Sequence, residues 1–162
     1  MIGYLKGNAV YSDEKKTILL TESGVGYEVN YGKFAAMGSE IEVFIHHHVS
    51  ENDQSLWAFD TLEEKKMFEL LKSVNKVGSS KAYPLVQLGV KNLISAITFE
   101  QTEILTQAQG IGKKMAEQII LSLKDKIDKF QVFKAQDLAK TEAAPGAIEE
   151  APVDSGLFQE AL

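Results

Sequence analysis

The first 60 residues alternate short apolar segments with polar or glycine-containing turns. The apolar segments are rich in β-branched and aromatic residues, which favour strands, and the stretches between them are typical of tight turns. Because a sheet that closes on itself has no exposed edges, five or six short strands at this spacing predict a small closed β-barrel. The predicted strands are residues 2–5, 8–11, 17–20, 25–29, 40–46 and 55–59.

After residue 60 the apolar positions recur every three or four residues, which is typical of amphipathic helices. Thr61 and Glu64 have the spacing of a capping box, which starts a helix, and an apolar stripe follows from Met67 to Val74. The two patterns together predict an α+β chain in which a barrel is followed by an all-α region. Further helices are predicted at about 79–88, 91–97, 100–107 and 113–129.

The end of the chain differs in composition from both regions. Residues 136–154 are acidic, rich in Ala and Pro and without aromatic side chains, which predicts a flexible linker. Residues 155–162 begin a helical pattern that stops after one or two turns, so we expect them to start a C-terminal domain that is truncated or missing. The expected domains are therefore a barrel over 1–61 and a helical domain over 62–135, followed by these two segments.

Composition excludes several classes of protein. The chain of 162 residues contains no cysteine, so it has no disulfide framework and no thiolate metal site. Its apolar runs are far shorter than the ~20 residues that span a bilayer, and its first residues lack the apolar core of a signal peptide. We therefore expect a cytoplasmic protein that does not bind a membrane.

The charge is distributed unevenly along the chain. The net charge is −6, but residues 61–135 hold 12 Lys and 8 acidic residues, a net charge of +4. All 17 basic residues are Lys, which excludes bidentate recognition of guanine by Arg. If the basic region binds nucleic acid, we expect it to contact the phosphate backbone without reading the sequence.

The most specific motif lies at residues 110–114, where Gly-Ile-Gly-Lys-Lys separates two predicted helices in the manner of a helix-hairpin-helix unit. Glycine permits the tight turn, the Ile side chain can pack between the helices, and free N–H groups at the start of the second helix can bind a phosphate. The alternative is a plain helix–helix turn with two solvated lysines. The candidate phosphate-binding residues are Gly110, Ile111, Gly112, Lys113 and Lys114.

A second, weaker copy of this motif lies 34 residues upstream, where residues 77–78 match residues 111–112. Two such hairpins in tandem could hold two phosphates of one duplex. Lys76 replaces the first glycine, however, and Pro84 stands where the next helix should continue, so a purely structural hairpin is an equal alternative. The candidate residues in this copy are Val77, Gly78, Ser79, Ser80 and Lys81.

No motif indicates catalysis, a cofactor or a metal. In the run from His46 to His48, alternate side chains of a strand point to opposite faces, so only the first and the third share a face. The chain has no Ser/His/Asp set and no phosphate loop, so ATP hydrolysis must belong to another chain. A nuclease or glycosylase would need a catalytic Asp or Lys beside the hairpin, and Asp125 and Asp128 lie too far along the helix.

The chain up to about residue 130 resembles the RuvA family, the bacterial subunits that bind Holliday junctions and work with the RuvB motor. The resemblance implies an N-terminal OB-fold barrel, a domain of two tandem helix-hairpin-helix motifs and a mobile C-terminal helical domain that contacts RuvB. The matching segments, in order, are residues 1–3, 24–29, 56–59, 63–68 and 110–117.

The resemblance also implies an assembly and its partners. We expect a homotetramer, or an octamer of two tetramers, that holds four-way junction DNA open, with a RuvB-type hexameric ATPase and a junction resolvase as partners. The family carries an acidic pin in the loop before the last barrel strand, where carboxylates would repel phosphates and keep strands apart. The matching residues here are Glu51, Asn52 and Asp53, although the loop taken alone is an ordinary polar turn.

Three positions depart from the family in a direction that weakens phosphate contact: Tyr4 in the barrel, Lys76 in the first hairpin, and Gln118 where many relatives carry Arg. We therefore expect weaker or more salt-sensitive binding than in a more basic relative. The main alternative is a generic OB and helix-hairpin-helix DNA-binding accessory protein without junction preference. A purely structural oligomerisation module is less consistent with the Lys-rich region.

Overall fold

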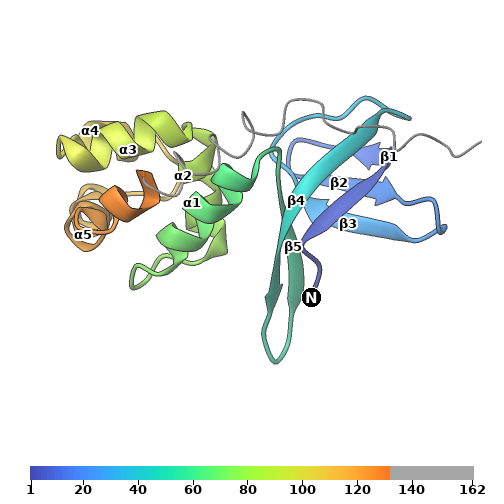
Figure 1. Cartoon of the computed structure of the whole chain (residues 1–162), viewed down its shortest axis with the longest axis horizontal. Coiled ribbons are helices and arrows are strands. Elements are labelled where there is room, and N and C mark those ends of the chain that lie inside the picture. The colour runs from blue at the N-terminus through green and yellow to red at the C-terminus, as the bar shows by residue number, and fades with distance from the viewer. Residues whose placement is uncertain (132–162) are drawn as a thin grey trace, which may run out of the picture. The chain divides into compact units, whose positions relative to one another are not determined.

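The computed structural model describes residues 1–131. The predicted linker at 136–154 and the segment at 155–162 lie outside the described residues, so both stay predictions. The barrel and the five helices described below belong to one compact unit, Met1–Asp128 (Figure 1).

Five strands close into a barrel in the order β1-β2-β3-β5-β4 (Figure 1). β1 pairs with both β2 and β4, and every pairing is antiparallel except the parallel one between β3 and β5. This closed five-stranded arrangement confirms the predicted barrel and gives it the character of an OB fold. The strands are β1 (Tyr4–Ser12), β2 (Lys16–Leu20), β3 (Gly26–Asn30), β4 (Glu40–Val49) and β5 (Gln54–Phe59).

The prediction of two separate strands before residue 12 was wrong, because both segments belong to β1. The strand continues through Lys6 and Gly7, with Lys6 exposed and Gly7 buried in regular alternation. A Cβ at Gly7 would lie 2.7 Å from the carbonyl oxygen of Leu20, so glycine here permits a close approach of two paired strands. The sequence pattern alone does not distinguish that use of glycine from a turn.

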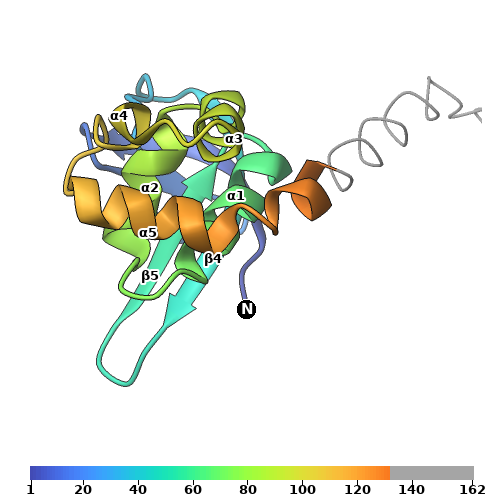
Figure 2. The same ribbon diagram turned by 90° about the vertical axis from the view of Figure 1, so that its left-hand side faces the viewer.

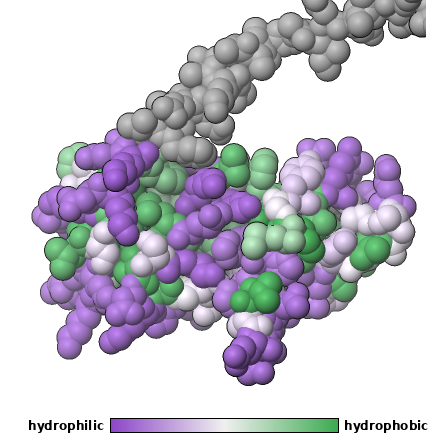
Figure 3. All heavy atoms as spheres, turned by 60° about the horizontal axis from the view of Figure 1, so that its bottom comes forward, coloured by the Kyte–Doolittle hydropathy of each residue, from purple (hydrophilic) through white to green (hydrophobic). Residues whose placement is uncertain are grey.

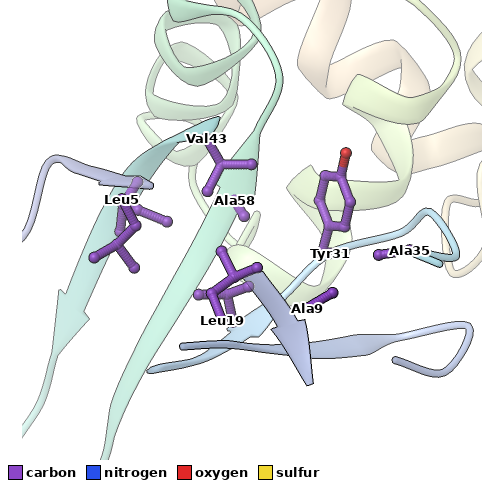
Figure 4. Packing of buried hydrophobic residues seen from close by; sticks show 9 residues of the cluster. Leu5, Ala9, Leu19, Tyr31, Ala35, Val43 and Ala58 are labelled. Carbon is purple, nitrogen blue, oxygen red and sulfur yellow. The ribbon is translucent and has the colours of Figure 1, made fainter. Parts of the chain in front are cut away.

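The barrel core is filled by the inward-facing side chains of all five strands (Figure 4). Because successive strand residues point to opposite faces, the buried positions of β1 are every second residue: Leu5, Gly7 and Ala9. The buried hydrophobic cluster consists of Leu5, Ala9, Leu19, Val29, Tyr31, Ala35, Val43, Ile45 and Ala58.

All five predicted helices are present and most begin within one residue of the predicted start, but the one predicted at 100–107 is a single turn, Thr102–Leu105. The Oγ1 of Thr61 accepts a 3.2 Å hydrogen bond from the backbone N–H of Glu64, which confirms the helix start at the capping box. The predicted helix at 113–129 is interrupted: α5 ends at Leu123, the N–H of Lys126 donates to the carbonyl of Leu123 and tightens the chain into a turn, and helix resumes at residues 127–131. The helices are α1 (Leu62–Lys72), α2 (Ser79–Gln87), α3 (Val90–Thr98), α4 (Thr102–Leu105) and α5 (Lys113–Leu123).

Pro84 does not interrupt α2, contrary to the sequence expectation. A proline inside a helix removes one N–H donor, and here it is the donor that would bind the carbonyl of Ser80. The residues on both sides of the proline are buried, so tertiary packing holds the helix despite the lost hydrogen bond. These buried residues are Ala82, Tyr83, Leu85 and Val86.

Aromatic side chains join the barrel to the first two helices. The Tyr83 hydroxyl donates to the carbonyl of Ala58 at 3.0 Å and accepts from the N–H of Gly32 at 2.9 Å. Burial raises the pKa of Tyr83 to about 12, so the hydroxyl stays protonated and keeps both hydrogen bonds at neutral pH. Its ring belongs to a cluster of four aromatic rings with centroids 5.0–6.3 Å apart, formed by Trp57, Phe59, Phe68 and Tyr83.

Candidate nucleic-acid interface

Two helix–turn–helix connections have the same backbone conformation. We call the turn between α1 and α2 hairpin 1 (residues 73–78) and the turn between α4 and α5 hairpin 2 (residues 106–112). The residue before each helix is an extended glycine: φ and ψ are −89° and −177° at Gly78, and −87° and 173° at Gly112. Hairpin 1, the weaker copy of the motif in the sequence, is therefore a structural repeat of hairpin 2.

The repeat extends to the two residues before each of these glycines. Val77 and Ile111 are buried, with 4% and 6% of their surfaces exposed, so each turn directs an aliphatic side chain into the interior of the protein. Lys76 and Gly110, one position earlier, both have positive φ, of 68° and 84°. Hairpin 1 thus keeps the left-handed turn even though it has lost the glycine that favours it.

The starts of α2 and α5 differ from the start of α1 in a way that favours anions. α1 is capped by Thr61 and carries Glu63 and Glu64 in its first turn. α2 and α5 have no side-chain cap and no acidic residue in the first turn. Their first N–H groups and the positive end of the helix dipole are therefore available to a negatively charged ligand.

The glycines that cap α2 and α5 have no steric role within the described part of the chain. Both have negative φ, which any residue adopts, and a Cβ at Gly78 or Gly112 would meet no atom within 4 Å. Ser or Asp would also cap the helix better than Gly. The open space in front of each helix is therefore what these glycines preserve, and it leaves room for a ligand to approach the backbone.

The polar side chains beside the two hairpins are unequal. Lys113 and Lys114 are both exposed in the first turn of α5, whereas the equivalent positions of α2 hold Ser79 and Ser80. Lys81 is half-buried one residue later. The two repeats therefore differ in where their lysines lie: hairpin 2 has both at the start of its helix, whereas hairpin 1 has Lys76 in the turn and Lys81 further along α2.

A hydrogen bond that the sequence analysis missed connects the repeats. The Nε2 of Gln118, in α5, donates to the carbonyl of Asn75, in hairpin 1, at 3.3 Å. The bond links α5 to hairpin 1, and the weaker phosphate contact expected at Gln118 stays a prediction. No local pattern could have indicated this contact, because the two residues are 43 positions apart.

The candidate acidic residues lie at the tip of a long hairpin. β4 and β5 extend beyond the rest of the barrel (Figures 1 and 2), and the tip is a hydrophilic protrusion (Figure 3). The N–H of Ser50 donates to the carbonyl of Asp53 at 2.8 Å and closes the turn. Glu51, Asn52 and Asp53 are all exposed, so their side chains are free to meet a partner.

The three histidines of β4 divide between the two faces of the strand, as predicted. The Lys72 ammonium donates to the Nε2 of His46 at 3.2 Å and to the Nδ1 of His48 at 3.3 Å, while the Nδ1 of His47 accepts from the N–H of Ile2. Burial, and then the charge of Lys72, lower the pKa of His46. Within residues 1–131 no group of three or more His, Asp or Glu is placed to hold a metal.

Comparison with known proteins agrees with this geometry. A family model described as the RuvA N terminal domain matches residues 1–58, and one described as a SAM-like helix-hairpin-helix tandem matches residues 68–125. In the part of the chain that the structure describes, no helix is long and apolar enough to cross a membrane. Fold and hairpins together define a protein built from an OB barrel and tandem helix-hairpin-helix motifs.

Curated relatives identify the family within that class. The Holliday junction branch migration complex subunit RuvA of Halothermothrix orenii is 41% identical over 131 residues, which are 78% of this chain and 67% of that protein. The subunits of the same name from Ruminiclostridium cellulolyticum and Geobacter sulfurreducens are each 33% identical, over 88% and 91% of this chain and 74% and 77% of their own. The chain belongs to the RuvA family.

Proposed function

We propose that this protein binds four-way junction DNA through its phosphates and serves as the DNA-binding subunit of a branch migration complex. The observation that carries the proposal is the pair of equivalent, uncapped helix starts at Gly78 and Gly112, within a chain of the RuvA family. Each helix start would bind one phosphate, so the two hairpins of a protomer would contact the DNA backbone at two points.

The interaction is electrostatic and indifferent to base sequence. Lys113 and Lys114 place two positive charges where a phosphate approaches the N–H groups of α5. No arginine is present to read guanine, and contacts to phosphates carry no sequence information. Affinity should therefore fall steeply with salt, with a logarithmic slope of about −0.9 for each phosphate contacted.

The acidic loop would act on the DNA by repulsion. Glu51 and Asp53 lie at the tip of the extended β4–β5 hairpin, where nothing in the described part of the chain neutralises them by an ion pair. A carboxylate held among phosphates favours arrangements that keep strands apart. In a junction this would oppose stacking of the arms at the crossover and keep it open.

The assembly follows from the same proposal. A four-way junction has four equivalent arms, so a homotetramer, or two tetramers facing each other, would match its symmetry. The relatives' names place them in a branch migration complex. In that setting this chain would hold the DNA in the bacterial cytoplasm without catalysing a reaction, while a RuvB-type ATPase supplies the motor and a junction resolvase acts on the product.

The test is a titration of a synthetic four-way junction against a linear duplex of equal length, at two salt concentrations. The proposal predicts a clear preference for the junction, and the double variant Lys113→Ala/Lys114→Ala should lose most of the binding. Lys91→Ala, an exposed lysine of α3, serves as the matched control. Equal affinity for both DNAs would favour the generic accessory protein instead.

A further inference from the structure

Two adjoining cavities form a groove along the unit Met1–Asp128. The larger, of about 460 Å³, lies between the barrel, α2 and hairpin 2, and the smaller, of about 280 Å³, lies along β3 and β5. Both are lined by Asn30 and Trp57, so the two cavities meet at this pair of residues. The larger one falls within the roughly 300–1,000 Å³ of typical ligand sites.

The groove connects the separate parts of the proposed DNA site. At one end it is lined by Ser80, in the first turn of α2, and by Gln109, next to Gly110 in hairpin 2. At the other end it is lined by Asp53, in the acidic loop. A strand that passes from the acidic loop to the two hairpins would therefore follow the groove and cross Trp57.

The middle of the groove has the chemistry that recognises a nucleobase. The Trp57 ring is fixed by packing against Tyr83, at 5.3 Å between centroids, and by the bond from its Nε1 to the Oγ of Ser55 at 3.0 Å. An aromatic surface offers stacking to any base, and amide side chains offer both donors and acceptors to its edge. The amides that line the larger cavity are Asn30, Gln87, Gln107 and Gln109.

The charges of the groove argue against a phosphate in the same place. The larger cavity holds one lysine, Lys15, beside Glu14. In the smaller one Lys16 is paired with Glu28 at 3.0 Å, and Asp53 adds a further negative charge. The groove is thus close to neutral where it widens and acidic at its far end, which suits an uncharged base better than an anion.

We propose that the cavity beside Trp57 receives one unpaired nucleobase of the junction, from the strand that runs between the acidic loop and the hairpins. The inference rests on the proposed function and adds a second kind of contact to it. Bases next to an open crossover lose a stacking neighbour, and the indole supplies a substitute. The bound base needs no particular identity, because stacking and amide contacts tolerate all four.

Trp57 is the only tryptophan of the chain, so its fluorescence reports on this site alone. The experiment titrates the protein with a four-way junction and with the same junction carrying abasic nucleotides around the crossover, while a gel shift follows binding in parallel. We expect saturating quenching with the intact junction and at least a threefold weaker change with the abasic one. Unchanged fluorescence on bound junction, or equal quenching by both junctions, would overturn the nucleobase site.

A variant test avoids the aromatic core. Gln107→Ala removes an exposed amide of the larger cavity, and Gln101→Ala removes an exposed amide that lines neither cavity. Gln107→Ala should weaken junction binding about threefold and reduce the quenching, with Gln101→Ala unchanged; equal behaviour of the two variants would count against the site. Failure of the wider proposal is distinguishable, because it would abolish junction preference in the gel shift itself.

Discussion

The two hairpins share one backbone but differ in their chemistry. Each turns through a residue with positive φ, anchors a buried aliphatic side chain and ends at an extended glycine before a helix. Hairpin 2 uses glycine for the turn and lysines for the charge, whereas hairpin 1 has Lys76 in the turn and serines in the helix. The comparison shows that packing preserves the backbone of the repeat, while the charge beside it varies independently.

The anchoring side chains should account for the largest effect. Ile111→Ala removes a buried branched side chain and should lower the free energy of unfolding by about 2–4 kcal/mol. Val77→Ala should lower the free energy of unfolding by about 1 kcal/mol less than Ile111→Ala does, because the change from valine removes one carbon fewer. Urea denaturation measures both, and a larger loss at Val77 would mean that hairpin 1 is the better packed of the two.

The next largest effect concerns charge. Lys113→Ala/Lys114→Ala should weaken junction binding by at least tenfold in moderate salt and reduce the logarithmic salt slope by about 2 for each protomer that contacts DNA. Ser79→Ala/Ser80→Ala, at the equivalent positions of hairpin 1, should reduce affinity only a few-fold and leave the slope unchanged. Fluorescence anisotropy over a salt series separates the two outcomes, and equal slopes for both variants would contradict the assigned asymmetry.

Substitutions at the two positive-φ residues, Gly110 and Lys76, should change the stability of the fold in opposite directions. Gly110→Ala puts a side chain at φ 84° and should destabilise the fold by about 1 kcal/mol, while Lys76→Gly relieves the same conformation and should stabilise it by a few tenths. Thermal unfolding compares them directly. A loss of stability in Lys76→Gly would show that its side chain makes contacts that outweigh the strain.

The smallest effect is on the dependence of stability on pH. The pKa of His46 is lowered in the fold, so the unfolded chain binds more protons below its ordinary value of 6.5. Stability should therefore fall as the pH drops through 6.5 and level off once the lower folded pKa is passed. The charged and titratable neighbours that set this response are Lys65, Glu69 and Lys72 of α1 and His48 of β4.

Urea titrations at pH 5 and pH 7.5 measure this dependence, and His46→Gln should flatten it. The contact between His46 and Lys72 lies at the end of α1, directly before hairpin 1. Acid should thus disturb hairpin 1 before hairpin 2, and amide exchange would show it. A uniform response of both hairpins would remove this distinction between them.

The sequence was sufficient for features determined by local patterns. The alternation of apolar positions predicted the barrel, and the spacing of Thr61 and Glu64 predicted the start of α1. Prediction from the sequence failed where residues distant in the chain determine the local structure. β1 continues through Gly7 because the backbone of Leu20 lies close to it, and α2 continues through Pro84 because its neighbours are buried. The phosphate-binding roles at the hairpins stay predictions, because they depend on a partner.

Much of the candidate site could not have been found without the fold. Gln118 reaches Asn75 across 43 positions, and the groove at Trp57 combines residues from the barrel, α2 and hairpin 2. Neither contact leaves a periodic signal, since each depends on how separate elements pack. A basic residue or a glycine motif is visible in the sequence, but a cavity is a property of the assembled chain.

The hydroxyl of Tyr83 has a consequence for how the chain folds. It hydrogen-bonds to Gly32, just after β3, and to Ala58, in β5. These are the two strands whose parallel pairing closes the barrel. The pairing of β3 with β5 is therefore stabilised by a side chain that belongs to α2. Barrel closure and helix docking should then form one cooperative step, and a fragment ending near residue 60 should not complete the barrel by itself.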